Sequence, residues 1–193
     1  RHIGLTKGYL NAVRYYEQIV EESAEPARML SYLVSYQLAY RMAPHANRTL
    51  ARMETEFPDD PWTQLEQAKK QATDGYSKAA IEALKAVVAE YEISEAYEAL
   101  ARLTSFYRGS IRAADYARRA VDLKGFYEIK LHRLLAETLF DARKFADHLE
   151  TIEVIERYED LTHEQLISKA SSLYATDEAG KSRQILLTAV NDP

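Results

Sequence analysis

The sequence contains no cysteine, which excludes disulfide bonds, zinc–thiolate sites and a cysteine nucleophile. Such a chain is compatible with both reducing and oxidising compartments, so a cytoplasmic location, which we prefer, and a periplasmic location both stay open. No apolar stretch reaches the roughly 18 residues that a membrane span requires, and the first residues, RHIGLTKGYL, lack the apolar run of a secretory signal. We therefore expect no membrane insertion.

Glycine and proline are also few, with six and five residues among 193. They fall between apolar-periodic segments rather than inside them, which is typical of helices separated by short turns. No segment alternates apolar and polar residues over the length of a strand. The sequence thus predicts an all-α chain, with helices over residues 6–22, 27–41, 44–57, 61–73, 77–91, 95–107, 110–123, 126–140, 144–158, 163–175 and 179–190.

A net charge of −5 argues against wholesale binding of nucleic acid or of an anionic membrane. The charge is unevenly distributed: residues 100–133 contain eight Lys or Arg and three Asp or Glu, whereas residues 134–193 contain six and twelve. Two interpretations stay open. Either the charged side chains lie on the water-exposed faces of amphipathic helices, or the basic middle segment is a patch that binds an acidic partner segment.

Three helix starts recur at a fixed spacing. Asp60 before Pro61, Ser94 before EAYEAL and Thr162 before HEQL all have the side chain of an N-cap, which accepts from an otherwise unpaired backbone N–H. Gln165 lies three positions after Thr162, where it can complete a capping box. The sequence numbers of the three starts differ by 34 and by 68, which is twice 34.

The turns have the same period. Asp74-Gly75-Tyr76 and Arg108-Gly109-Ser110 lie 34 positions apart, and further steps of 34 from Gly109 reach Arg143 and Asp177. A period of about 34 residues, with two helices in each, predicts a helical solenoid. The predicted units form a single repeat array over residues 1–193, with boundaries near 1–24, 25–58, 59–92, 93–125, 126–160 and 161–193.

The unit that begins at Ser94 resembles the tetratricopeptide repeat (TPR), which has large and small residues on its first helix, a glycine turn and small residues on its second helix. The resemblance implies a right-handed α-solenoid of antiparallel helix pairs, about five repeats plus an N-terminal helix; other helical-hairpin solenoids are the alternative. The other units are looser, and His148 stands where a small residue is expected. The matching residues are Tyr97, Leu100, Ala101, Gly109, Ala113, Ala117 and Ala120.

The two ends both look like parts of a repeat. Gly8-Tyr9 echoes Gly75-Tyr76, so GYLNAVRYYEQIVEE has the pattern of a second helix whose first helix is absent, and AVNDP closes a unit as TEFP does. We expect the chain to be a fragment of a longer protein. The alternative is that the first helix is a native cap, since terminal repeats are often atypical.

Candidate catalytic residues do not form a pattern. His163-Glu164 begins like a zincin motif but no second His follows at the required spacing, so these residues are predicted to form a first helical turn. His45, His132 and His148 lie in separate units without carboxylates at ligand spacing. We expect no catalytic residue, no metal and no cofactor.

The resemblance implies that the concave surface, lined by the first helices, holds an extended peptide or a partner helix. Acids and bases are mixed there, which suits a polypeptide better than a polyanion, and an acidic partner segment would be engaged by Arg102 and Arg133. An RNA-binding helical-repeat protein and a non-catalytic docking region of a larger enzyme are alternatives, and the oligomeric state stays open. The predicted partner-binding residues are Glu95, Glu98, Arg102, Ser105, Lys130, Arg133, Glu137 and Phe140.

Overall fold

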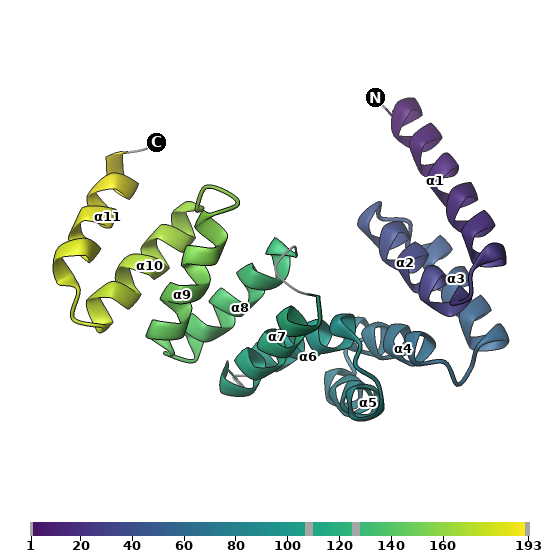
Figure 1. Ribbon diagram of the computed structural model, residues 1–193. Helices are drawn as coiled ribbons and strands as arrows, with labels where there is room; N and C mark the ends of the chain where they lie inside the picture. The colour runs from purple at the N-terminus through teal and green to yellow at the C-terminus, as the bar shows by residue number, and fades with distance from the viewer. Residues whose placement is uncertain (1, 107–109, 125–127, 192–193) are drawn as a thin grey trace. The chain divides into compact units, whose positions relative to one another are not determined.

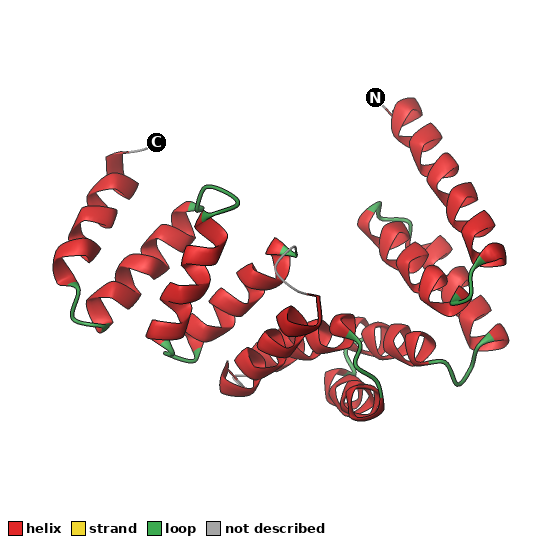
Figure 2. Cartoon of the chain, in the orientation of Figure 1, coloured by secondary structure: helices red, strands yellow, loops and turns green. Residues whose placement is uncertain are grey.

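The computed structural model describes residues 2–106, 110–124 and 128–191, and within these ranges it contains helices and no strand (Figure 2). The chain divides into two compact units, residues 1–87 and 88–193. The predicted all-α class is therefore confirmed, while the single continuous array stays a prediction. The helices, labelled in Figure 1, are α1 His2–Glu22, α2 Pro26–Ala39, α3 Ala43–Glu56, α4 Pro61–Thr73, α5 Ser77–Glu90, α6 Ser94–Phe106, α7 Ser110–Lys124, α8 Ile129–Asp141, α9 Phe145–Glu156, α10 His163–Ala175 and α11 Ala179–Asn191.

Two of the predicted helices differ noticeably from the observed ones. Helix α1 begins at His2 instead of the predicted position 6 and continues through Gly8, so Gly8-Tyr9 does not form a turn like Gly75-Tyr76. One glycine inside a long helix costs only about 1 kcal/mol, which the flanking helix-forming residues offset. Helix α8 begins at Ile129 instead of the predicted position 126. Every other helix has both ends within two positions of its predicted range.

The turns between the paired helices repeat one backbone geometry. Arg41, Gly75, Arg143 and Asp177 have positive φ angles of 59°, 93°, 56° and 63°, and their sequence numbers differ by 34, 68 and 34 in turn. The predicted breaks at Gly75, Arg143 and Asp177 are confirmed, and the one at Gly109 lies outside the described residues. In each turn the next amide N–H reaches back five positions to a carbonyl, which is the Schellman pattern. These bonds are Met42 to Gln37, 2.8 Å; Tyr76 to Gln71, 2.8 Å; Lys144 to Leu139, 3.0 Å; and Glu178 to Leu173, 2.8 Å.

Two of the three predicted helix caps are confirmed. The Asp60 carboxylate accepts from the Trp62 N–H at 2.8 Å, and Thr162 and Gln165 form a reciprocal capping box. The N-cap prediction for Ser94 is wrong, because Ser94 is the first residue of α6 and its hydroxyl donates to the Ala120 carbonyl of α7 at 2.9 Å. Burial of Ser94 between the two helices makes it an anchor of α6 on α7 rather than a cap.

The predicted seam alanines are confirmed as buried. Ala113, Ala117 and Ala120 on α7 have no exposed surface. Small side chains at this spacing let two helices approach closely, because they form one stripe along α7. A second position on the second helices recurs every 34 residues and is always buried. It is occupied by a small residue in four repeats and by a histidine in one. The residues are Ala46, Ala80, Ala114, His148 and Ser182.

The cores of the two units are built from such stripes and from the apolar residues facing them. In residues 1–87, helices α1, α2 and α3 share a cluster around Leu30, Leu50 and Met53. In residues 88–193, α6, α7 and α8 share a cluster that includes Ala114 and Leu134. No helix in the described part of the chain is long and apolar enough to cross a membrane.

Candidate binding site

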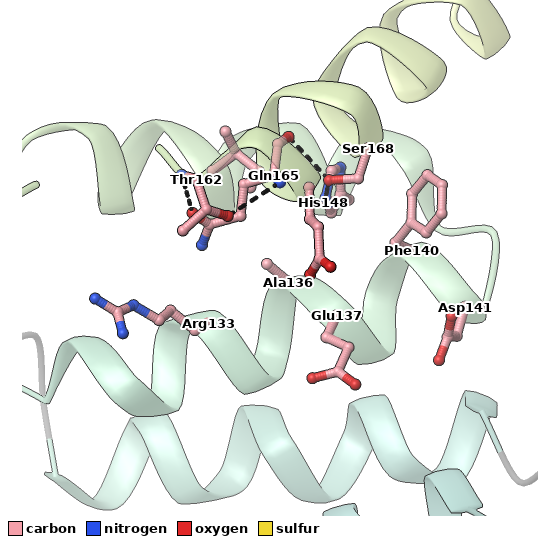
Figure 3. A pocket seen from close by; sticks show the side chains of 11 residues that line it. Arg133, Ala136, Glu137, Phe140, Asp141, His148, Thr162, Gln165 and Ser168 are labelled. Carbon is pink, nitrogen blue, oxygen red and sulfur yellow. Dashed lines mark hydrogen bonds between the residues drawn. The ribbon is translucent and has the colours of Figure 1, made fainter. Parts of the chain in front are cut away.

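A cavity of about 370 Å³ lies between α8 and α10 in the second unit (Figure 3). Helices α8 and α10 are the first helices of two consecutive predicted repeats, so the cavity lies on the surface where the sequence predicts partner binding. Figure 3 shows the α8 side chains along one side and those of Thr162, Gln165 and Ser168 along the other. The lining residues are Arg133, Ala136, Glu137, Phe140, Asp141, His148, Ile152, Thr162, Glu164, Gln165 and Ser168.

Helical periodicity positions one wall of the cavity, and a capping box positions the other. Arg133, Glu137 and Phe140 are separated by four and three positions, so they lie on one face of α8. The opposite wall is fixed by the capping box of Thr162 and Gln165, which sets the residue at which α10 begins. Helix α9 contributes the two most buried lining residues, His148 and Ile152, which are 1% and 0% exposed.

The imidazole of His148 is hydrogen-bonded at both ring nitrogens. Its Nδ1 lies 2.9 Å from the Ser172 hydroxyl and its Nε2 lies 3.3 Å from the Ser168 hydroxyl. Ser168 donates its own proton to the Gln165 carbonyl at 2.9 Å, so it accepts from Nε2–H, and Ser172 donates to Nδ1. This network assigns the neutral Nε2–H tautomer.

Burial reinforces the neutral form of His148. It lowers the pKa of the imidazole from its ordinary value to about 4, because the charged form would lose its hydration. The Phe140 ring lies 5.3 Å from the imidazole and 6.0 Å from Phe145, so the cavity has an aromatic side next to the histidine. At neutral pH, His148 therefore contributes polarity but no charge.

Three of the predicted partner-binding residues, Arg133, Glu137 and Phe140, line this cavity. The other five lie on α6 or at the start of α8, and these two helices contact each other. Four of the five, Glu95, Glu98, Arg102 and Lys130, take part in ion pairs. The fifth, Ser105, is half-buried near the end of α6. Whether these residues bind a partner stays a prediction.

The basic residues of the middle segment are largely committed to ion pairs. Six of the eight Lys and Arg in residues 100–133 have a carboxylate partner, and Arg108 lies outside the described residues. Arg133 donates from two nitrogens to both oxygens of Glu159, which lowers the pKa of that carboxyl. The structure thus favours charge pairing, within and between its elements, over a free basic patch. The pairs are Arg102–Glu98, Arg118–Asp147, Arg119–Glu92, Lys124–Glu95, Lys130–Glu98 and Arg133–Glu159.

The carboxylates of the cavity behave differently. Glu137, Asp141 and Glu164 line it, and none of them has an ion-pair partner within the described ranges. Across the same part of the chain, no group of three or more His, Asp or Glu side chains has the arrangement of a metal site. The cavity therefore combines apolar lining residues with a net negative charge.

Sequence reasoning missed the α9 and α10 side of the cavity and two of its α8 residues. One signal was present: a step of 34 from Lys130, a predicted groove position, reaches Glu164. A second signal was His148, the residue that breaks the small-residue position of the second helices. The missed lining residues are Ala136, Asp141, His148, Ile152, Thr162, Glu164, Gln165 and Ser168.

The first unit contains a cavity of about 260 Å³ at the corresponding position, between α2 and α4. Five of its lining residues have sequence numbers lower by 102, which is three periods of 34, than lining residues of the larger cavity. The two cavities are thus the same feature of the repeat with different side chains. The corresponding pairs are Val34 and Ala136, Leu38 and Phe140, Ala46 and His148, Leu50 and Ile152, and Glu66 and Ser168.

Comparison with solved structures identifies the architecture. YrrB, described as a TPR protein with an unusual peptide-binding site, is 12% identical, with a TM-score of 0.66 and coverage of 91% of both chains. PilF of Pseudomonas aeruginosa is 13% identical over 96% of this chain and 87% of its own, with a TM-score of 0.64. MamA is 17% identical over 87% and 92%, with a TM-score of 0.62.

The chain has a tetratricopeptide-type helical-repeat fold. At these identities the likeness shows the fold alone. No protein-family model matches the sequence, and no curated protein matches it either.

Proposed function

We propose that this chain is a non-catalytic protein-interaction module that binds a polypeptide segment along the first-helix face of its second unit, over α6, α8 and α10. The observation that carries the proposal is the cavity between α8 and α10, which is lined by residues from two predicted repeats. A peptide crossing adjacent first helices would place one side chain there. The described peptide-binding site of YrrB, which has the same fold, supports this assignment.

The ion pairs of the middle segment argue against the RNA-binding alternative. Nucleic-acid affinity depends on basic side chains that neutralise phosphates, and here Arg102, Lys130 and Arg133 already have carboxylate partners. RNA binding would require these pairs to break. A polypeptide of mixed charge needs no such rearrangement.

Site-specific photo-crosslinking in the source cells tests the proposal. A benzophenone amino acid at Ser105 or Lys130, both on the predicted face but outside the cavity, should capture a defined segment of a partner. The same amino acid at Glu150, on the exposed side of α9, is the control and should not capture it. A synthetic peptide of the captured segment should then bind the purified chain. Equal capture from Glu150, or a peptide that fails to bind, would place the interaction elsewhere.

A further inference from the structure

We propose that the cavity between α8 and α10 is a subsite for a basic side chain, arginine or lysine, of the bound polypeptide. The inference rests on the proposed function, since it specifies which residue of the partner the cavity selects. It also replaces the acidic segment expected from the sequence with a segment that carries positive charge. Charge, aromatic character and volume each support it.

The charge balance of the cavity is negative. Glu137, Asp141 and Glu164 line it without an ion-pair partner among the residues that the structure describes. The basic lining residue, Arg133, is bonded to both carboxylate oxygens of Glu159. A cation would provide the opposite charge that these carboxylates lack, whereas an acidic side chain would meet electrostatic repulsion.

The aromatic side of the cavity also suits a cation. Phe140 is half-buried, and its ring is held by edge contacts with Phe145 and by the tilted imidazole of His148. Cations are attracted to the face of an aromatic ring, and the planar guanidinium of arginine can stack on it. The neutral imidazole adds no repulsion. Carboxylates next to an aromatic ring therefore favour a guanidinium or an ammonium group.

The volume fits a side chain rather than a larger element. About 370 Å³ is near the small end of the range of roughly 300 to 1,000 Å³ that is typical of ligand pockets. A single long side chain can enter such a space while its backbone stays on the surface. The subsite would thus anchor one residue of an extended segment.

The corresponding cavity of the first unit has the same position in the repeat but not the same charge or aromatic character. Its charged lining residues are already paired: Glu66 with Lys69 at 2.8 Å, and Lys70 with Asp74 at 2.5 Å. Its hydrophobic residue at the place of Phe140 is Leu38. The same position in the repeat has therefore no unpaired charge and no aromatic ring, so we assign the basic-residue subsite to the second unit only.

Nuclear magnetic resonance of the whole ¹⁵N-labelled chain tests the subsite with N-acetyl-arginine amide as the probe. At low salt the probe should shift the amide signals of Phe140, Glu164 and Ser168 and saturate in the millimolar range, as expected for so small a ligand. N-acetyl-glutamate amide should leave these signals unchanged. Binding of the glutamate probe, or no shift with the arginine probe, would overturn the inference.

A variant that removes two carboxylate charges tests whether the arginine probe binds in the cavity. Glu137→Gln combined with Glu164→Gln should weaken binding of the arginine probe about tenfold, because two carboxylates of the subsite are removed. Glu150→Gln combined with Glu153→Gln removes the same charge from the exposed side of α9 and should leave the affinity unchanged. An equal loss in both variants would mean that only the overall charge matters and would overturn the subsite.

The two proposals can fail separately. If photo-crosslinking captures a segment without Arg or Lys and the arginine probe gives no shift, the proposed function stands and the basic subsite is wrong. If the arginine probe binds but the first-helix face captures no segment, the subsite is a cation pocket and the proposed function is wrong.

Discussion

The two corresponding cavities show how one repeat position acquires different chemistry. In the first unit, Ala46 and Leu50 of α3 line the cavity together with Glu66, whose carboxylate accepts from the Ser31 hydroxyl and is neutralised by Lys69. In the second unit, His148 replaces the alanine, a serine replaces the glutamate, and the acidic lining residues have no ion-pair partner in the described part of the chain. The two cavities occupy the same position in the repeat, and their side chains distinguish a cavity whose charged residues are paired from a candidate binding site.

The difference depends on a matched substitution across two helices. A histidine at the small position of α9 requires two hydroxyl partners, and α10 supplies Ser168 and Ser172. In the preceding repeat the small position is Ala114, and the places 34 positions before those serines are occupied by Leu134 and Thr138. A buried imidazole there would meet an apolar neighbour instead of one of its two partners.

The largest expected effect therefore comes from Ala114→His. The new ring would overpack the cluster of Ala114 and Leu134 and leave a buried nitrogen without a partner, so the free energy of unfolding should fall by about 3 kcal/mol or more. Urea unfolding at about pH 7.5 measures it. Ala114→Ser, which copies Ser182 of the last repeat, is the control and should cost less than about 1 kcal/mol. A folded, undestabilised Ala114→His variant would show that the serines are not needed.

The reciprocal change, His148→Ala, should also destabilise the chain, although it restores the alanine found in three other repeats. It would leave a cavity beside Ile152 and remove the partner of Ser172, at a cost of about 2 to 4 kcal/mol. The same unfolding measurement checks it, with Ser182→Ala as the matched control at a cost below about 1 kcal/mol. If His148→Ala is neutral or stabilising, the position selects only for small size, as the sequence suggested.

The sequence predicts the backbone of this molecule far better than its site. Helices, Schellman turns and buried alanines follow from local signals: glycine or a polar residue at each turn, caps at Asp60 and Thr162, and apolar periodicity. Ser94 shows the limit of such signals, because a serine before a helical pattern caps a helix in one context and bonds a neighbouring helix in another. Only the packing of α6 against α7 distinguishes the two.

The site could be predicted in part, because repeat periodicity locates the first-helix face but not the pairing of its charges. The sequence numbers of Arg133 and its partner Glu159 differ by 26, and those of Arg118 and Asp147 differ by 29. Neither spacing is a helical neighbour distance, so a sequence shows an excess of basic residues where the structure shows ion pairs. For the same reason, the sequence alone does not show which carboxylates of the cavity lack an ion-pair partner.

The pH dependence of stability should differ between the chain and its His148→Ala variant. The pKa of His148 is about 4 in the folded state and near 6.5 when unfolded, so the unfolded state binds more protons between these values. The stabilising contribution is present above about pH 6.5 and is lost as the pH falls toward 4, by about 2 kcal/mol between about pH 7.5 and 5. Urea unfolding at both pH values should show this loss in the parent chain but not in the variant. Equal pH dependence would mean that His148 titrates normally.

The smallest expected effect comes from removing one charge of the second-unit cavity, by breaking the Arg133–Glu159 ion pair. Arg133→Gln frees Glu159 and removes the basic lining residue, so the N-acetyl-arginine amide probe should bind about two- to threefold more tightly at low salt. The gain should shrink toward physiological ionic strength, where exposed charges are screened over about 8 Å.

Arg118→Gln is the matched control for this change. It breaks the exposed Arg118–Asp147 pair between α7 and α9, neither member of which lines the cavity, and it should leave the affinity for the probe unaltered. Each substitution should leave the stability nearly unchanged, as is usual for exposed ion pairs. Weaker binding in Arg133→Gln alone would show that Arg133 itself contacts the ligand, and the occupant of the cavity would then be an acidic side chain, as the sequence first suggested.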